Sequence, residues 1–338
     1  MKPSRIFLLL LILLTCACSR GGYKIVGDVF DLDEQDINLL DASGRTLGSS
    51  PVKDGKFVIE GKVDVPCLAY LNNGLGVNYP IDIPVMLENA RIRVKGDATQ
   101  ARITVSGTKA NENMVKYREK RDLLDPNDRN SYVLLLRETY EENIDNVLGS
   151  LMIHNMYSLV ADAELVEYCD RLPEPFRSDE TILHYRAISE ARVKTAVGQQ
   201  YVDLEVPGAD GTLVRLSDAV AVNSATVLVF WASWSRSAAS TLTELVQYCK
   251  PYAYRGLSMF TVSLDSNEAS WERSVRSFGL FGENYCPGPN DGDALASLYG
   301  IDGMPRYLLI DSSGRILVRS NEADDICEAL EKLYQKQI

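Results

Sequence analysis

Apolar and polar side chains alternate in short runs between residues 23 and 107, which is the pattern of strands with one buried face. Turn signals such as Asp54-Gly55 and Asn73-Gly74 separate these runs. Strands are predicted at residues 37–40, 56–59, 68–71, 81–87, 91–94 and 102–105. We therefore expect this part of the chain to form an all-β sandwich or barrel.

Residues 108–198 show a different period, because glycine becomes rarer and apolar residues recur every three or four positions. The spacing of Tyr132, Leu135, Leu136 and Tyr140 is typical of one face of a helix. Three or four helices are predicted, and no repeat or low-complexity linker interrupts them. We expect these helices to form a connecting segment that packs against its neighbours.

Strands and helices alternate in the last third of the chain. Residues 226–231 form an unbroken apolar run, as in a strand that is buried on both faces. A helix to about residue 254 and a strand at 257–264 complete a βαβ unit. Further elements are predicted as helices at 267–278, 291–299 and 322–336 and as a hairpin of strands at 307–311 and 315–319. Residues 199–338 are therefore expected to form an α/β domain.

The first eighteen residues have the features of an export signal. Lys2 and Arg5 precede an apolar run at 6–14, which is about half the ~20 residues that a membrane-spanning helix needs. Cys18 follows the small Ala17 directly after this run. This arrangement resembles the lipobox of bacterial lipoproteins, in which the cysteine is lipidated and becomes the mature N-terminus. The site departs from the usual lipobox at residue 15, where Thr replaces Leu, and a plain cleaved secretory signal is the alternative.

Charge and residue usage exclude some kinds of site. The formal net charge of −12 and the lack of a Lys/Arg cluster in the sequence argue against nucleic acid as a partner. The chain has two histidines, His154 and His184, and both fall in predicted helices without a nearby set of ligands. We therefore expect no transition-metal site, and nothing in the sequence points to a cofactor.

The cysteines give no disulfide framework. No Cys-x-x-Cys motif occurs, and the cysteines that follow the signal are odd in number and widely spaced. These residues are Cys67, Cys169, Cys249, Cys286 and Cys327. Small, buried apolar side chains are the simplest interpretation of them.

Two parts of the chain resemble known families. The sequence Phe-Trp-Ala-Ser-Trp-Ser at 230–235, with supporting motifs at 210–218, 262–265 and 299–305, resembles the thioredoxin superfamily. The resemblance covers residues 199–338 and is strongest to envelope thiol-disulfide oxidoreductases and to the alkyl hydroperoxide reductase/thiol-specific antioxidant group. The β part, through its residues 54–61, resembles the N-terminal domain of unknown function that precedes such domains in Bacteroidota lipoproteins. A thioredoxin fold is the implied architecture of the last third.

The resemblance fails at the catalytic positions. Family members carry Cys-x-x-Cys at the start of the helix, where the helix N-terminus lowers the pKa of the first thiol and the second thiol resolves the mixed disulfide. Here these positions are Ser235 and Ala238, and Val229 stands where thioredoxins proper carry a buried acid. We expect the Ser235 hydroxyl to cap the helix instead. The exchange reaction of the family is therefore not expected at this site.

A peptide groove is the feature that the resemblance leaves in place. Pro305 matches the family's cis-proline, and the preceding Met304 would present its backbone to an extended peptide. Trp231 and Trp234 match the aromatic residues beside the site. These four residues are the candidate groove, and the alternative is that the cis bond only shapes the turn.

The leading hypothesis is a redox-inactive thioredoxin-fold module on an envelope lipoprotein, with a binding, scaffolding or chaperone-like role. An envelope protein or an extended peptide is the expected partner, and the lipid on Cys18 would attach the chain to a membrane. Ser19 and Arg20 begin no acidic run after the cysteine, which favours the periplasmic side. The alternative is an oxidoreductase or peroxidase that uses a displaced thiol, for which Cys286 is the candidate.

Overall fold

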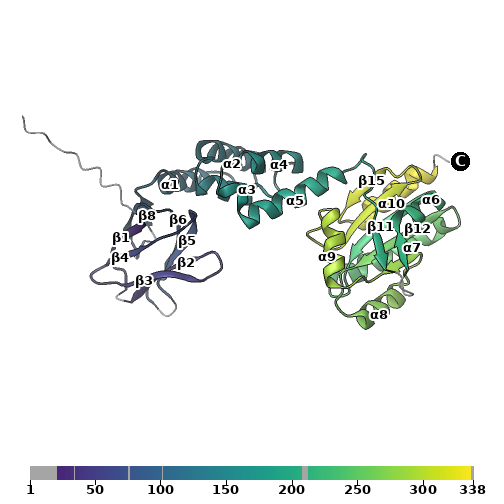
Figure 1. Ribbon diagram of the computed structural model, residues 1–338, viewed down its shortest axis with the longest axis horizontal. Coiled ribbons are helices and arrows are strands. Elements are labelled where there is room, and N and C mark those ends of the chain that lie inside the picture. Colours follow the sequence, from purple (N-terminus) through teal and green to yellow (C-terminus); the bar gives the residue numbers. More distant parts are fainter. Residues whose placement is uncertain (1–20, 34, 75–76, 101, 208–211, 336–338) are drawn as a thin grey trace, which may run out of the picture. The chain divides into compact units, whose positions relative to one another are not determined.

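The chain divides into two compact units. A computed structural model describes residues 21–33, 35–74, 77–100, 102–207 and 212–335 (Figure 1). The units are residues 1–156 with 172–176, and residues 157–171 with 177–338. Cys18, the motif residues Asp210 and Gly211, and the end of the last predicted helix lie outside the described residues. No described helix has both the length and the apolar character needed to span a bilayer.

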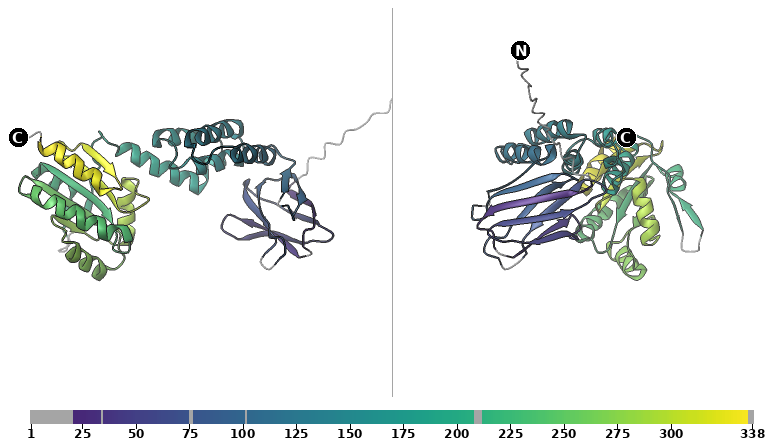
Figure 2. Two further views of the ribbon diagram at one scale, coloured as in Figure 1. Left: turned by 180° about the vertical axis from the view of Figure 1, so that it is seen from behind. Right: turned by 60° about the vertical axis from the view of Figure 1, so that its left-hand side comes forward.

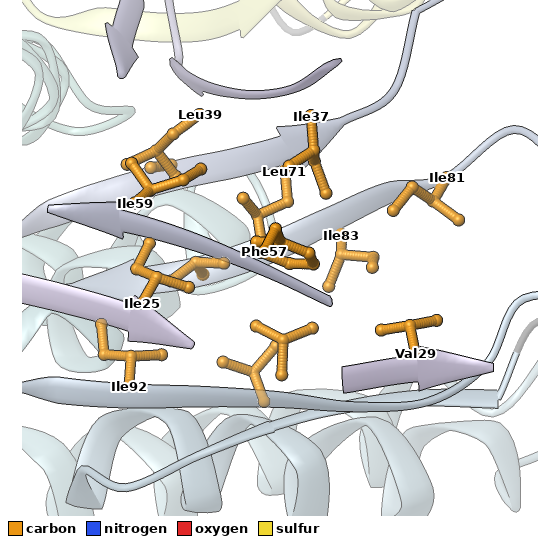
Figure 3. Packing of buried hydrophobic residues seen from close by; sticks show 14 of the residues in the cluster. Ile25, Val29, Ile37, Leu39, Phe57, Ile59, Leu71, Ile81, Ile83 and Ile92 are labelled. Carbon is orange, nitrogen blue, oxygen red and sulfur yellow. The ribbon is translucent and has the colours of Figure 1, made fainter. Parts of the chain in front are cut away.

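The first unit contains a sandwich of two four-stranded sheets, with strand orders β4-β1-β7-β8 and β3-β2-β5-β6. The strands are β1 (Tyr23–Phe30), β2 (Asp36–Asp41), β3 (Thr46–Pro51), β4 (Lys56–Gly61), β5 (Cys67–Asn72), β6 (Asp82–Leu87), β7 (Arg91–Asp97) and β8 (Arg102–Ser106). The expected β-sandwich is confirmed, and its core lies between the two sheets (Figure 3).

The pattern singled out six of these strands but not β1 or β3. β1 contains Gly27, and a glycine inside a strand weakens the sequence pattern from which a strand is predicted. The structure requires glycine there, because a Cβ at Gly27 would lie 2.0 Å from the ring of Phe57, its register partner on β4. β3 is rich in small polar residues and ends at Pro51, so its sequence carries little strand signal.

Three helices follow the sandwich in the first unit: α1 (Lys109–Asp122), α2 (Arg129–Asn143) and α3 (Val147–Met156). Thr108 caps α1, since its side chain accepts a hydrogen bond from the Asn111 amide. The buried Asn111 side chain then accepts from the Met86 amide at 2.9 Å and donates to the Met86 carbonyl at 2.8 Å. These bonds satisfy backbone groups of the edge strand β6 and attach α1 to the sandwich.

The second unit is built on a five-stranded mixed sheet with the order β13-β12-β11-β14-β15. Its strands are β11 (Ala225–Trp231), β12 (Leu257–Ser263), β13 (Glu283–Tyr285), β14 (Arg306–Asp311) and β15 (Ile316–Ser320), and a short hairpin of β9 (Glu205–Pro207) and β10 (Leu213–Arg215) precedes them. The helices are α4 (Asp162–Arg171), α5 (Glu180–Lys194), α6 (Leu216–Val222), α7 (Arg236–Ala253), α8 (Glu268–Phe278), α9 (Pro289–Leu298) and α10 (Ala323–Gln335).

Every residue of β11 is buried, as the apolar run predicted. Val227 and Val229 pack into a core with α7 and α10, whereas Leu228 and Phe230 pack into a second core on the opposite face. In Figure 2 the yellow α10 and the green α7 lie on the same side of the sheet. The expected fold class is thus confirmed, with an all-β part, a helical middle segment and a thioredoxin-type α/β sheet.

The middle segment is helical, as predicted, but α4 and α5 belong to the same compact unit as the sheet. α5 comes very close to the loop after α9. Gly300 has φ +60°, and a Cβ there would lie 2.5 Å from the Ile188 carbonyl oxygen of α5. Arg192 of α5 also donates to the Gly300 carbonyl at 3.0 Å. Glycine at 300 therefore permits the packing of α5 against this loop.

We expect Gly300→Ala to lower the free energy of unfolding of the second unit by at least about 2 kcal/mol, because alanine is disfavoured at positive φ and would clash with backbone. Gly303→Ala is the matched control, since nothing lies within 4 Å of its Cβ position. Urea unfolding followed by tryptophan fluorescence reports this unit alone, because Trp231, Trp234 and Trp271 all lie in it. Equal losses in both variants would contradict the proposed close approach.

Candidate functional site

The site predicted from sequence lies where β11 ends and α7 begins. Ser235 occupies the N-cap position of α7, but its side chain makes no capping hydrogen bond. The hydroxyl instead donates to the Met304 carbonyl oxygen at 3.4 Å. The expectation that the Ser235 hydroxyl caps the helix is therefore wrong. The side chain reaches across to the loop that carries the proline.

Ala238 lies one turn into α7 with no exposed surface. It belongs to the core between α7, α10 and the sheet. Ser235 and Ala238 thus keep the relation of the two family cysteines, with one residue at the helix start and the other buried beneath it. The two positions together offer a hydroxyl and a methyl group, and neither can form a disulfide.

The peptide bond between Met304 and Pro305 is cis, which confirms the prediction for this pair. Pro305 is buried, and Met304 is half-buried against the core. Trp234, directly before Ser235, is 66% exposed. These residues bring the loop before β14 and the start of α7 together at one end of the sheet.

Trp231 does not line this surface. It is fully buried, and its indole packs edge-on against Phe278 of α8 with ring centroids 5.7 Å apart. The alternation of β11 explains this position, since Trp231 points to the same face as Val227 and Val229. The sequence analysis placed Trp231 in the candidate groove, but its side chain is buried, and Trp234, Met304 and Pro305 remain the candidates.

A buried carboxylate from the 262–265 motif, to which sequence reasoning gave no role, supports the loop between β11 and α7. Asp265 follows β12 and is 2% exposed. Its carboxylate accepts from the Ser233 amide at 2.9 Å, from the Ser233 hydroxyl at 2.6 Å and from the Ser263 hydroxyl at 2.7 Å. These bonds tie the end of β12 to the loop that precedes Ser235. Asp265 is therefore a positioning residue for the site.

Comparisons with known proteins agree with this geometry. Residues 197–319 match the model of the AhpC/TSA family, and residues 23–114 match a domain of unknown function (DUF4369). The chain joins a DUF4369 domain to an AhpC/TSA thioredoxin-like domain. The AhpC/TSA match covers the α/β sheet and the helices that follow β11 up to α9, and the DUF4369 match corresponds to the β-sandwich and the start of α1.

Several solved structures resemble the thioredoxin-like domain, and structures of Bacteroides proteins are among them. A thiol:disulfide interchange protein from Bacteroides sp. is 20% identical, with 41% of this chain and 90% of that chain covered and a TM-score of 0.37. The thioredoxin domain of a thiol-disulfide oxidoreductase from Bacteroides vulgatus is 20% identical, with 40% and 96% covered and a TM-score of 0.37. A thiol-disulfide oxidoreductase from Bacteroides fragilis is 25% identical, with 40% and 99% covered and a TM-score of 0.36. The comparison with curated proteins found no match.

Cys286 of the thioredoxin-like domain lies in the loop between β13 and α9, where the sequence placed it. Its Sγ is 3.4 Å from the Asp265 carbonyl oxygen, so the thiol is close to the residue that supports the Ser233 loop. Burial raises the pKa of the Cys286 thiol, which disfavours the reactive thiolate at neutral pH. The five cysteines that the structure describes are all free thiols. Among the same described residues, no cluster of His, Cys, Asp or Glu side chains could hold a metal ion.

The loop at 299–305 is held from its other side by charged groups of α4 and α5. Arg192 forms an ion pair with Asp302 and lies 3.5 Å from Asp162. The Tyr157 hydroxyl donates to Asp302 at 2.6 Å, and the Arg192 guanidinium lies 5.4 Å from the centre of the Tyr157 ring. Sequence reasoning missed this cluster, because its members come from segments about 110 to 145 residues apart.

A second arginine also binds this loop. Arg319 of β15 donates to the Tyr299 carbonyl at 2.5 Å and to the Thr195 hydroxyl at 2.9 Å. Burial, together with the nearby Arg306 and Arg192, lowers the pKa of Arg319 to about 10. Arg319 remains charged at neutral pH, so its bond to the Tyr299 carbonyl is charge-assisted.

Asp302→Asn is expected to lower the free energy of unfolding by about 2 kcal/mol at pH 7, because it weakens hydrogen bonds to a charged group. Partial burial acts to raise the pKa of Asp302, but the bonds from Tyr157 and Arg192 outweigh it and hold the pKa below its usual value. The stabilisation is therefore present above the unfolded pKa of about 3.9 and is lost as the pH falls through the lower folded pKa.

The measurement is urea unfolding of both proteins between pH 7 and pH 3, followed by tryptophan fluorescence. The difference between parent and variant should shrink towards zero at the acid end. Glu328→Gln is the control, since Glu328 is 72% exposed and its ion pair with Lys332 is worth at most about 0.5 kcal/mol. A loss that stays constant with pH would exclude the charge of Asp302 as its cause.

Proposed function

We propose that the thioredoxin-like domain is a binding module that has lost dithiol exchange. The observation that carries this proposal is the pair of positions at the start of α7, where Ser235 and Ala238 stand and Ser235 is hydrogen-bonded to the Met304 carbonyl. Exchange needs an attacking thiolate and a resolving thiol that are held together at a helix end. Neither residue supplies a thiol.

The surface beside Ser235 suits an extended polypeptide. Trp234 exposes a large apolar side chain, and Met304 places a backbone carbonyl beside it. A carbonyl oxygen has two lone pairs, so the bond from Ser235 leaves one acceptor site for a peptide N–H. A β-type backbone contact, with a side chain of the partner against Trp234, is the recognition that these groups support.

The module would act at the cell envelope. The signal at 1–18 and the position of Cys18 support a lipid-anchored protein, and the lack of an acidic run at residues 19–22 supports a periplasm-facing orientation. Its partner is then an envelope protein or an extended segment of one. The role that follows is binding, scaffolding or chaperone-like retention near the membrane.

A thiol enzyme that uses Cys286 is the second candidate. The favourable observation is the contact of Cys286 with Asp265, which places this thiol near the Ser233 loop. The raised pKa of the thiol opposes it, because the reactive form is the thiolate. The redox test below separates the two candidates.

The parent chain is expected to show no catalytic reduction of insulin disulfides with dithiothreitol as reductant. The variant Ser235→Cys with Ala238→Cys should gain measurable activity, since Trp234 and the cis Pro305 still surround the site. Ser235→Cys alone is the matched control. It should form mixed disulfides without turnover, because the resolving thiol is absent.

Cys286→Ser completes this experiment. If the parent reduces insulin and Cys286→Ser abolishes that activity, the binding-module proposal is wrong and the displaced-thiol enzyme replaces it. If the parent is inactive and the double-cysteine variant is active, the site has kept its geometry and lost only its thiols.

The lipid anchor is tested separately. Full-length chain expressed in a bacterial envelope should partition into the detergent phase, whereas Cys18→Ala should move to the aqueous phase or keep its uncleaved signal. The diacyl or triacyl group gives stable anchoring because each buried CH₂ contributes about 0.8 kcal/mol and more than one chain is present. Cys16→Ala is the control, and unchanged membrane association of Cys18→Ala would refute lipidation at this residue.

A further inference from the structure

The outward face of the sheet β4-β1-β7-β8 gathers basic side chains that are scattered in the sequence. Alternate residues of each strand point away from the core, and the side chains at these positions are exposed or half-buried. The basic members are Lys24, Lys56, Arg91, Arg93, Lys95 and Arg102, and the acidic members are Asp28, Glu60 and Asp97. We call this surface the basic face. It is cationic on a chain whose net charge is −12.

The strand register brings these cations together. Arg91 lies beside Lys24 on the neighbouring strand, and Arg93 has Val26 and Ser106 as its neighbours. Like charges directly opposite each other destabilise a sheet. Lys24 is paired with Glu60, but no described residue forms an ion pair with Arg91 or Arg93. Ion pairs within the basic face therefore do not neutralise the charges of Arg91 and Arg93.

Apolar side chains lie among the cations. Val26 and Val58 are register partners at the centre of the face, and Val58 is 46% exposed. Phe30, at the end of β1 on the same face, is 68% exposed. Cations with exposed aliphatic and aromatic side chains suit the boundary of a lipid bilayer, where phosphate groups and acyl chains are both within reach.

The position at which the chain enters the sandwich also favours a lipid bilayer as the surface that contacts the basic face. β1 begins at Tyr23, and Lys24 is the first outward residue of the basic face. Cys18 precedes Tyr23 by five residues, which span at most ~17 Å when fully extended. A lipid on Cys18 would thus keep the start of β1 close to the membrane. This step rests on the proposed lipid anchor, whereas the charge and register arguments do not.

We propose that the basic face of the DUF4369 domain lies against an anionic phospholipid surface. The net negative charge of the chain does not oppose this contact, because charges farther than about 8–10 Å from the surface are screened at physiological salt. The lipid anchor and the basic face then act as two signals for one membrane, the combination that stable attachment requires. The sandwich would be oriented by this contact as well as tethered.

The test uses the mature chain without lipid, residues 19–338, and measures its co-sedimentation with vesicles. Binding is expected to vesicles of phosphatidylcholine with phosphatidylglycerol, to be absent with phosphatidylcholine alone and to weaken with added salt. Arg91→Glu with Arg93→Glu should weaken this binding at least about tenfold, since each basic side chain near an anionic leaflet contributes roughly fivefold.

Arg118→Glu with Lys120→Glu is the matched control, because it makes the same change in charge on exposed residues of α1 in the same unit. It should leave vesicle binding within about twofold of the parent. Circular dichroism of both variants establishes that the sandwich is folded.

Three results would overturn the proposal: no binding of the parent to anionic vesicles, equal weakening by the two variants, or binding of the parent to DNA but not to vesicles. Because this chain carries no lipid, the outcome is independent of the Cys18→Ala experiment. The proposal for the basic face can be refuted while lipidation of Cys18 is confirmed, and lipidation can be refuted while the basic face binds vesicles.

Discussion

The burial of β11 along its whole length is the constraint on which the second unit depends. A strand with no exposed residue needs a hydrogen-bonded neighbour on each side and a layer of helices on each face. β12 and β14 supply the neighbours, and α7 with α10 covers one of the two faces. The same strand sets the location of the site, because α7 can begin only at the edge of the sheet where β11 ends.

Local patterns in the sequence predicted much of this arrangement. The apolar run of β11 and the helix α7 were predicted because each depends on residues close together in the chain, whereas the cis Pro305 was predicted from the family resemblance. The burial of Trp231 was not predicted, although the alternation of β11 held the necessary information. The family resemblance identified the residue type at position 231, but it gave no information on the direction of the side chain.

Features made by distant segments could not be predicted. Asp265 and Ser233 follow two neighbouring strands, and Arg192 and Asp302 are more than a hundred residues apart in the chain. Neither contact therefore produces a periodic pattern in the sequence. The basic face is hidden for the same reason. Its cations alternate with core residues on four strands, and a search for runs of Lys and Arg along the chain finds none.

The motif at 299–305 has a structural explanation that does not require redox chemistry. Gly300 permits the approach of α5, and Asp302 holds Arg192, so both residues serve the packing of the unit. The Met304 carbonyl oxygen accepts a hydrogen bond from the Ser235 hydroxyl, and this bond joins the loop to α7. The presence of these family residues is therefore no evidence for catalysis. The chemical difference from an oxidoreductase lies in the side chains at 235 and 238, on a framework that packing alone is sufficient to maintain.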